Sequence, residues 1–112
     1  MSRRAHGLRA WILQRFTAVY IASFLAYLGL RFWNHPVGSH AAWKAWLADP
    51  FVNLAVGLFI LTILVHAWVG IRDVILDYVR HPGLKVTLLA AVALTLAGCG
   101  LWSLRVLFVL VY

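Results

Sequence analysis

Residues 51–78 read FVNLAVGLFILTILVHAWVGIRDVILDY, and this stretch decides how the rest of the chain is interpreted. Its first 21 residues, Phe51–Ile71, carry no formal charge. At about 1.5 Å per residue, a helix of this length crosses the hydrocarbon core of a bilayer. His66 lies inside it, where an ionisable ring costs free energy and therefore usually has a partner and often a function. Neutral imidazole is also a common ligand of haem iron and other metals.

The composition indicates a small membrane protein that forms a single domain over residues 1–112. Hydrophobic residues make up 64% of the chain, and the mean hydropathy of +0.90 is too high for a soluble domain of this length. Ten Lys and Arg residues against three acidic residues give a net charge of +7. Because these charges flank apolar stretches, they are explained by topology and anionic lipid headgroups, and no nucleic-acid partner is expected.

The apolar stretches predict an all-α membrane protein with three transmembrane helices, at about 11–33, 51–76 and 84–108. The last two are separated by the sequence RHPG, which predicts a tight turn containing Pro82 and Gly83.

The connection between the first two helices contains a weaker helical pattern. Ser39 is a suitable helix cap, and Trp43, Trp46 and Leu47 fall on one side of the segment that follows it. This pattern predicts an interfacial helix over 41–48 that lies on the membrane. A disordered loop is the alternative.

The positive charges predict the orientation of the helices. Seven of the ten basic residues lie in the N-terminal segment or near the second connection: Arg3, Arg4, Arg9, Arg15, Arg72, Arg80 and Lys85. The first connection carries only Arg31 and Lys44, and Arg105 is a single charge near the end of the third helix. Because basic residues favour the cytoplasmic side, the N-terminus is expected in the cytoplasm and the C-terminus on the opposite side.

Helical periodicity places several polar residues on the face of His66. Successive residues rotate by about 100°, so Gly70, Asp73 and Asp77 fall within about 40° of it. Gly70 is expected to leave room for a flat macrocycle. The two carboxylates lie roughly 10–17 Å further along, at the cytoplasmic surface. Tyr78 points about 120° aside from His66 at the same depth as Asp77.

Arg15 lies in the same leaflet as His66 and carries a permanent positive charge. A guanidinium there suits a carboxylate such as a haem propionate, through paired hydrogen bonds. Simple contact with lipid headgroups is the alternative for Arg15. For His66 the alternatives are a structural hydrogen bond to a neighbouring helix and a proton path.

A six-coordinate haem needs two strong axial ligands, and this chain has no second histidine at the right depth. The remaining histidines lie in the N-terminal segment or in the connections: His6, His35, His40 and His81. A bis-histidine haem must therefore take its second ligand from another chain. Three helices are also few to enclose a porphyrin, so a heteromeric membrane complex is predicted.

Two segments together resemble a known family. They are HGLRAWILQRFTAVY at 6–20 and HAWVGIRDVILDYV at 66–79. The combination of W-x-x-Q-R-x-T-A, H-A-W-x-G, and D-Y eleven and twelve residues after that histidine resembles the hydrophobic membrane-anchor subunits of bacterial succinate dehydrogenase, respiratory complex II. Each motif alone is weak, but the resemblance covers nearly the whole chain.

The resemblance implies a role for each candidate residue. His66 corresponds to an axial ligand of haem b, whose other ligand comes from the cytochrome b556 subunit. Arg15 corresponds to an arginine near the haem propionates. Asp77 and Tyr78 correspond to an Asp-Tyr pair beside the ubiquinone site, in which the tyrosine hydroxyl donates a hydrogen bond to a quinone carbonyl.

The resemblance also implies an anchor and electron-transfer subunit of succinate:ubiquinone oxidoreductase in the bacterial inner membrane, with its C-terminus in the periplasm. Its partners would be the cytochrome b556, iron–sulfur and flavoprotein subunits, and this chain would perform no dicarboxylate chemistry. The charged pair Arg72–Asp73 departs from the family pattern and leaves the charge near the quinone open. The alternatives are a fumarate reductase anchor and a small haem-free transporter with a proton-sensitive His66.

Overall fold

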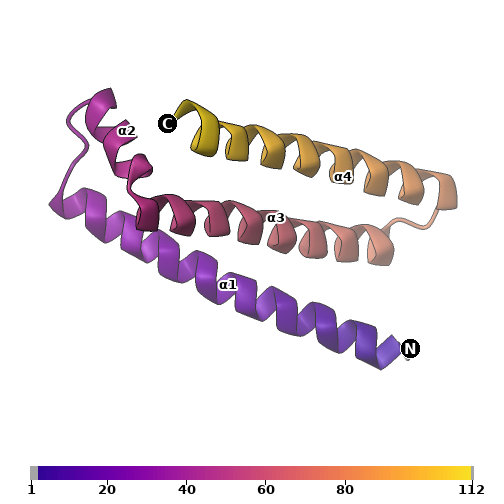
Figure 1. Ribbon diagram of the computed structural model, residues 1–112. Coiled ribbons are helices and arrows are strands. Elements are labelled where there is room, and N and C mark those ends of the chain that lie inside the picture. Colours follow the sequence, from indigo (N-terminus) through magenta and orange to yellow (C-terminus); the bar gives the residue numbers. More distant parts are fainter. Residues whose placement is uncertain (1–2, 112) are drawn as a thin grey trace.

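The computed structural model describes residues 3–111, and within that range the chain is helical and contains no strand. The helices are α1 (Arg3–Asn34), α2 (His40–Ala48), α3 (Pro50–Tyr78), α4 (Pro82–Arg105) and a short π-helix, η1 (Val106–Leu110). α3 lies between α1 and α4 and packs against both (Figure 1). The N-terminus and the α3–α4 turn lie at one end of the molecule, which we call the N-terminal end. α2 and the C-terminus lie at the other, which we call the C-terminal end.

Three segments are long and apolar enough to cross a membrane: Gly7–Asn34, Pro50–Tyr78 and Pro82–Val109. The prediction of an all-α protein with three helices of membrane-spanning length is thereby confirmed for the described residues. Each of these three segments is longer than the apolar stretch that predicted it. Hydropathy marks the part of a helix that matches hydrocarbon, whereas the helix itself continues until a cap or a breaking residue ends it.

The short helix expected over 41–48 is present as α2. The Ser39 side chain accepts a hydrogen bond from the Ala42 backbone N–H at 3.1 Å, which satisfies one of the unpaired donors of the first turn. The rings of Trp43 and Trp46 lie 5.5 Å apart, and both contact Phe32 near the end of α1. These aromatic contacts hold α2 against the C-terminal end of the bundle.

A single residue, Asp49, separates α2 from α3. Its Oδ1 accepts hydrogen bonds from the backbone N–H groups of Phe51 and Val52, at 3.0 and 3.2 Å. Pro50 occupies the first helical position, where its missing N–H costs nothing. The corner is therefore short because one side chain caps the helix that follows it.

The turn between α3 and α4 differs from the prediction. Pro82 and Gly83 belong to the first turn of α4 and not to the connection, which is formed by residues 79–81. The His81 Nδ1 accepts a hydrogen bond from the Leu84 backbone N–H at 3.1 Å, so the histidine caps the helix. The predicted position of the turn is wrong because a proline with a capping residue before it starts a helix as readily as it ends one.

Glycines allow α3 and α4 to approach closely. A Cβ atom on the buried Gly100 of α4 would lie only 2.6 Å from Leu64 Cδ1 of α3. A Cβ atom on Gly57 of α3 would lie 3.3 Å from Phe108 Cζ. Small residues at such contacts are typical of helix packing in membranes, where the backbones must come close to gain dispersion contacts.

A buried amide joins three elements at the C-terminal end. Asn53, with 7% of its surface exposed, lies in the first turns of α3. Its Nδ2 donates to the backbone carbonyls of Leu47 in α2 at 3.1 Å and Leu107 in η1 at 3.4 Å. Leu47, Leu107 and Val111 form a small hydrophobic core beside it.

Candidate functional site

His66 is half-buried on α3 and meets α1 through its side chain. Its Nδ1 lies 2.9 Å from Oγ1 of Thr17, a residue with 8% of its surface exposed. The intramembrane histidine thus has the polar partner that burial in an apolar region requires. Among the side chains that the structure describes, those of residues 7–109 and 111, no hydrogen-bond partner is found for the other ring nitrogen, Nε2. The imidazole therefore keeps one nitrogen for a further ligand.

The hydroxyl of Thr17 is fixed by its own helix. Oγ1 lies 2.8 Å from the Leu13 carbonyl oxygen and 3.0 Å from the Gln14 carbonyl oxygen. A threonine inside a helix commonly bonds a carbonyl one turn earlier, and this bond selects its rotamer. The oxygen that faces His66 is therefore held in place from the α1 side.

Gly70, one turn after His66, faces the side chain of Gln14. A Cβ atom at this position would lie 3.1 Å from Gln14 Nε2, a tighter distance than ordinary van der Waals contact. In the described chain, the space beside Gly70 is thus shared with an amide of α1. Gln14 Oε1 is buried and has no hydrogen-bond partner among the side chains that the structure describes. The expected role of Gly70 beside a macrocycle stays a prediction.

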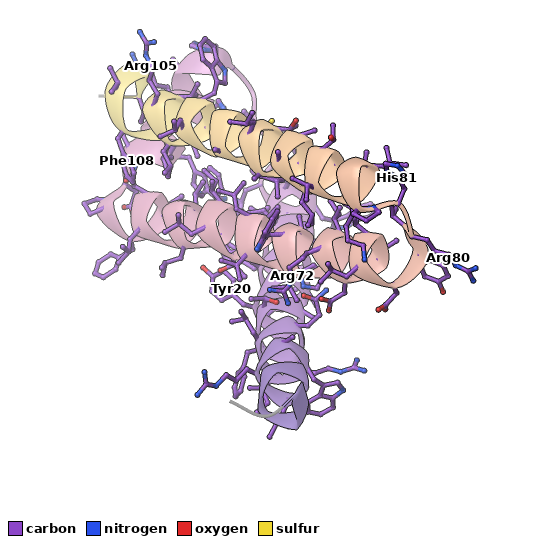
Figure 2. The ribbon with its side chains drawn as sticks, turned by 90° about the vertical axis from the view of Figure 1, so that its right-hand side faces the viewer. Tyr20, Arg72, Arg80, His81, Arg105 and Phe108 are labelled. Carbon is purple, nitrogen blue, oxygen red and sulfur yellow. The ribbon has the colours of Figure 1, made fainter. Side chains whose placement is uncertain are left out.

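A hollow of about 550 Å³ opens between α1 and α3 toward the N-terminal end, and its polar lining comes from both helices. α1 contributes Trp11, Gln14 and Arg15, and α3 contributes Arg72 and Asp73. Figure 2 shows Arg72 beside the region where α1 and α3 meet. The two helices thus form a recess with cationic, anionic and amide groups.

The charges in this hollow are partly paired. The Arg72 guanidinium lies 3.2 Å from Asp73 Oδ1, with 35% and 48% of the two side chains exposed. The Arg15 guanidinium lies over the Trp11 ring, 5.3 Å from its centre. A cation held on an aromatic face keeps its hydrogen-bond donors available. Because Arg72 and Asp73 largely offset each other, Arg15 supplies the net positive charge of the hollow.

Asp77 and Tyr78 lie at the end of α3, roughly 17–18 Å along the helix from His66. Both are exposed, Tyr78 by 79%, and no hydrogen bond to either side chain is found in the described part of the chain. Figure 2 labels Arg80 and His81 in the adjoining turn between α3 and α4. The two side chains are available to a ligand or to another protein.

The residues predicted for the site therefore fall into two groups, one where α3 meets α1 and one at the end of α3. His66 and Gly70 face α1 in the interior, with Arg15 and Asp73 at the adjacent hollow, whereas Asp77 and Tyr78 stand at the exposed end of the helix. Among the described side chains of residues 7–109 and 111, no group of three or more His, Cys, Asp or Glu could hold a metal ion. His66 is a single donor, so a metal bound there would take its other ligands from a cofactor or another chain.

Two polar residues at the site were not given a role from the sequence. Thr17 belongs to the quoted motif W-x-x-Q-R-x-T-A, and Gln14 lies one turn before it. The signal that could have revealed them is the one that revealed His66: a polar side chain inside an apolar span needs a partner. Sequence spacing did not show that Thr17 and Gln14 of α1 lie opposite His66 and Gly70 of α3.

Comparison with known proteins gives a consistent result. Residues 1–111 match the family model described as the succinate dehydrogenase/fumarate reductase transmembrane subunit. The chain is 30% identical over 112 residues to a succinate dehydrogenase hydrophobic membrane anchor subunit of Coxiella burnetii, covering 96% of this chain and 92% of that protein. It is 33% identical over 91 residues to the subunit of the same name from Rickettsia conorii, covering 79% and 71%. With three membrane-length helices and a match along almost its whole length, the chain belongs to the family of succinate dehydrogenase/fumarate reductase transmembrane subunits.

Proposed function

We propose that this membrane-anchor subunit serves a succinate:ubiquinone oxidoreductase, in which it shares the ligation of haem b and contributes to the ubiquinone site. The observation that carries the proposal is His66, which lies in a helix of membrane-spanning length. Its Nδ1 is hydrogen-bonded, and its Nε2 has no partner among the described side chains. The names of both relatives support succinate dehydrogenase over the reverse activity, fumarate reduction, which the family description also covers.

His66 fits haem iron because of its chemistry and its position. A neutral imidazole nitrogen with a free lone pair is a strong axial ligand, and a hydrogen bond at the other nitrogen orients the ring. When bound, haem b supplies one-electron redox chemistry. The second axial ligand would come from a cytochrome b556 subunit, because the other histidines of this chain lie outside the apolar spans.

Arg15 is proposed to neutralise a haem propionate. Its guanidinium is positioned on the Trp11 ring at the hollow between α1 and α3. The paired N–H donors of arginine match the two oxygens of a carboxylate. Gly70 is proposed to lie beside the macrocycle, where rearrangement of the Gln14 side chain would be needed to admit it.

Tyr78 is proposed to donate a hydrogen bond to a ubiquinone carbonyl, with Asp77 beside it. A quinone carbonyl is only an acceptor, and its reduction builds negative charge on that oxygen. A tyrosine hydroxyl is a neutral donor whose hydrogen bond strengthens as the charge develops. The exposure of both side chains at the end of α3 leaves them free for this contact.

The proposed setting is the bacterial inner membrane. The N-terminus and the α3–α4 turn share one end of the molecule, and the basic residues of both favour the cytoplasm. The C-terminus would then be periplasmic. Tyr78 would face an iron–sulfur subunit that docks with a flavoprotein subunit on the cytoplasmic side.

The test is the visible and electron paramagnetic resonance spectrum of the purified complex carrying His66→Leu. Leucine offers no lone pair to iron, so the low-spin bis-imidazole signals should disappear, whatever haem remains bound. His35→Leu removes a histidine from the α1–α2 connection, outside the helices, and should leave the spectrum unchanged. A His66→Leu complex with an unchanged low-spin spectrum would contradict the proposal, and a wild-type complex without haem bands would favour a haem-free membrane protein.

A further inference from the structure

The hydroxyl of Thr17 has one proton and three neighbours that compete for it. Oγ1 lies 2.8 Å from the Leu13 carbonyl oxygen, 3.0 Å from the Gln14 carbonyl oxygen and 2.9 Å from His66 Nδ1. The two carbonyl oxygens can only accept hydrogen bonds, whereas a ring nitrogen of histidine donates or accepts according to its tautomer.

The proton of Thr17 is therefore best placed toward its own helix. If it pointed at His66, two carbonyl oxygens would approach the hydroxyl oxygen at 3.0 Å or less with no proton between them. If it points to its own helix, at one carbonyl or shared between the two, and His66 carries its proton on Nδ1, the hydroxyl donates to the helix and accepts from the imidazole. Which tautomer a histidine adopts is set in this way by the bond that its other nitrogen makes.

We infer that Thr17 is a positioning residue that holds His66 as the Nδ1–H tautomer and so directs the Nε2 lone pair to a metal cofactor. The part of this inference that concerns haem rests on the proposed function. The accepting hydroxyl also makes the imidazole a more basic ligand, as outer hydrogen-bond partners of metal-bound histidines do.

The burial of Thr17 strengthens its effect on the tautomer of His66. With 8% of its surface exposed, the residue is shielded from water that could replace its hydroxyl as acceptor. A hydrogen bond in such surroundings is electrostatically stronger than one in water. The neighbouring Gln14 amide nitrogen lies against Gly70, one turn further along α3 than His66. Among the described side chains, Thr17 is thus the group that hydrogen-bonds to the imidazole.

The experiment measures the midpoint potential of the haem and its low-spin electron paramagnetic resonance signal in the assembled complex, for a series at position 17. Thr17→Ser keeps the accepting hydroxyl, Thr17→Cys offers a weak sulfur acceptor, and Thr17→Val has similar shape and no acceptor. A less basic imidazole stabilises ferric iron less. The midpoint potential of the haem should therefore become more positive in the order Ser, Cys, Val, with the Ser variant close to wild type. The low-spin electron paramagnetic resonance signal should shift in the same order.

A matched control separates this effect from the loss of any intramembrane hydroxyl. Thr95 of α4 donates to the Ala91 carbonyl of its own helix at 2.8 Å and is exposed. Thr95→Val should leave both the potential and the resonance unchanged. If Thr17→Val fails to assemble, the comparison of Ser with Cys still tests the inference.

The outcomes distinguish this inference from the proposed function. If His66→Leu loses the low-spin signal while the position 17 series matches wild type, His66 binds haem and the inference about Thr17 is wrong. If Ser shifts the potential as much as Val, the hydroxyl is not the relevant group, and the inference is also wrong. If His66→Leu keeps the signal, the proposed function itself fails.

Discussion

Tyr78 places one hydroxyl group at the exposed end of α3, where we propose the quinone site. It is 79% exposed and has no hydrogen bond in the described part of the chain. An aromatic ring left so accessible at the end of a transmembrane helix suits an interface with another molecule. Packing within this chain therefore does not explain the residue, which makes its substitution a direct test of the quinone site.

Tyr78→Phe keeps the ring and removes only the donor. We expect ubiquinone reduction by the complex to fall about 10-fold, the scale of one hydrogen bond to a developing charge. Succinate oxidation with a soluble artificial acceptor should be retained, because this step does not need the quinone site. The measurement is the ratio of the two steady-state rates.

Tyr27→Phe is the matched control for this ratio. Tyr27 lies in the second half of α1 and is 45% exposed, so the same hydroxyl is removed far along the bundle from Tyr78. Its ratio should equal that of wild type. Equal losses of both activities in Tyr78→Phe would indicate a role in assembly, and no loss of either would remove Tyr78 from the quinone site.

At the scale of helices, the contact between α3 and α4 depends on small residues. A Cβ atom at Gly100 would meet Leu64 Cδ1 at 2.6 Å, closer than real Cβ contacts. Gly98, two residues earlier on the same helix, has no atom within 4 Å of the same ideal position. One helix thus offers a close-packed glycine and an open glycine as a matched pair.

Gly100→Val is expected to destabilise the subunit by about 1–3 kcal/mol, because the branched side chain must displace Leu64 or separate the helices. Gly98→Val places the same side chain in open space and should cost much less. The measurement is the thermal denaturation midpoint of the purified complex in one detergent. Equal midpoints for the two variants would show that α3 and α4 do not approach as closely as described.

At the scale of the whole molecule, little of the chain is buried. In the most apolar windows of the three spans, 11%, 11% and 6% of the residues are buried within the chain. Lipid can cover exposed apolar residues, but it cannot satisfy polar groups such as those of the hollow between α1 and α3. Further protein subunits are therefore expected to complete the structure.

We expect mild detergent extraction to recover the chain together with a second small membrane subunit and two soluble subunits. Expressed without the other subunits, the chain should be unstable or aggregate, because lipid cannot satisfy the polar groups of the hollow between α1 and α3. The measurement is the subunit composition of the affinity-purified protein by mass spectrometry. Recovery of a stable, haem-loaded monomer would contradict this prediction.

The sequence by itself determined the features that depend on one helix at a time. The apolar stretches predicted three transmembrane helices, and Ser39 predicted where α2 begins. The motifs around Arg15 and His66 indicated the family that the comparison confirmed. These features follow from hydropathy and from hydrogen bonds between residues that are close in sequence.

Only the tertiary structure decided which groups meet across helices. Periodicity placed His66 and Gly70 on one face of α3 but could not show that Thr17 and Gln14 of α1 lie opposite them. It also left open how Arg72 and Asp73 would interact, and the structure pairs them at 3.2 Å. The physical reason is that helical spacing fixes the direction of a side chain relative to its own axis, whereas its partner depends on where a second helix crosses.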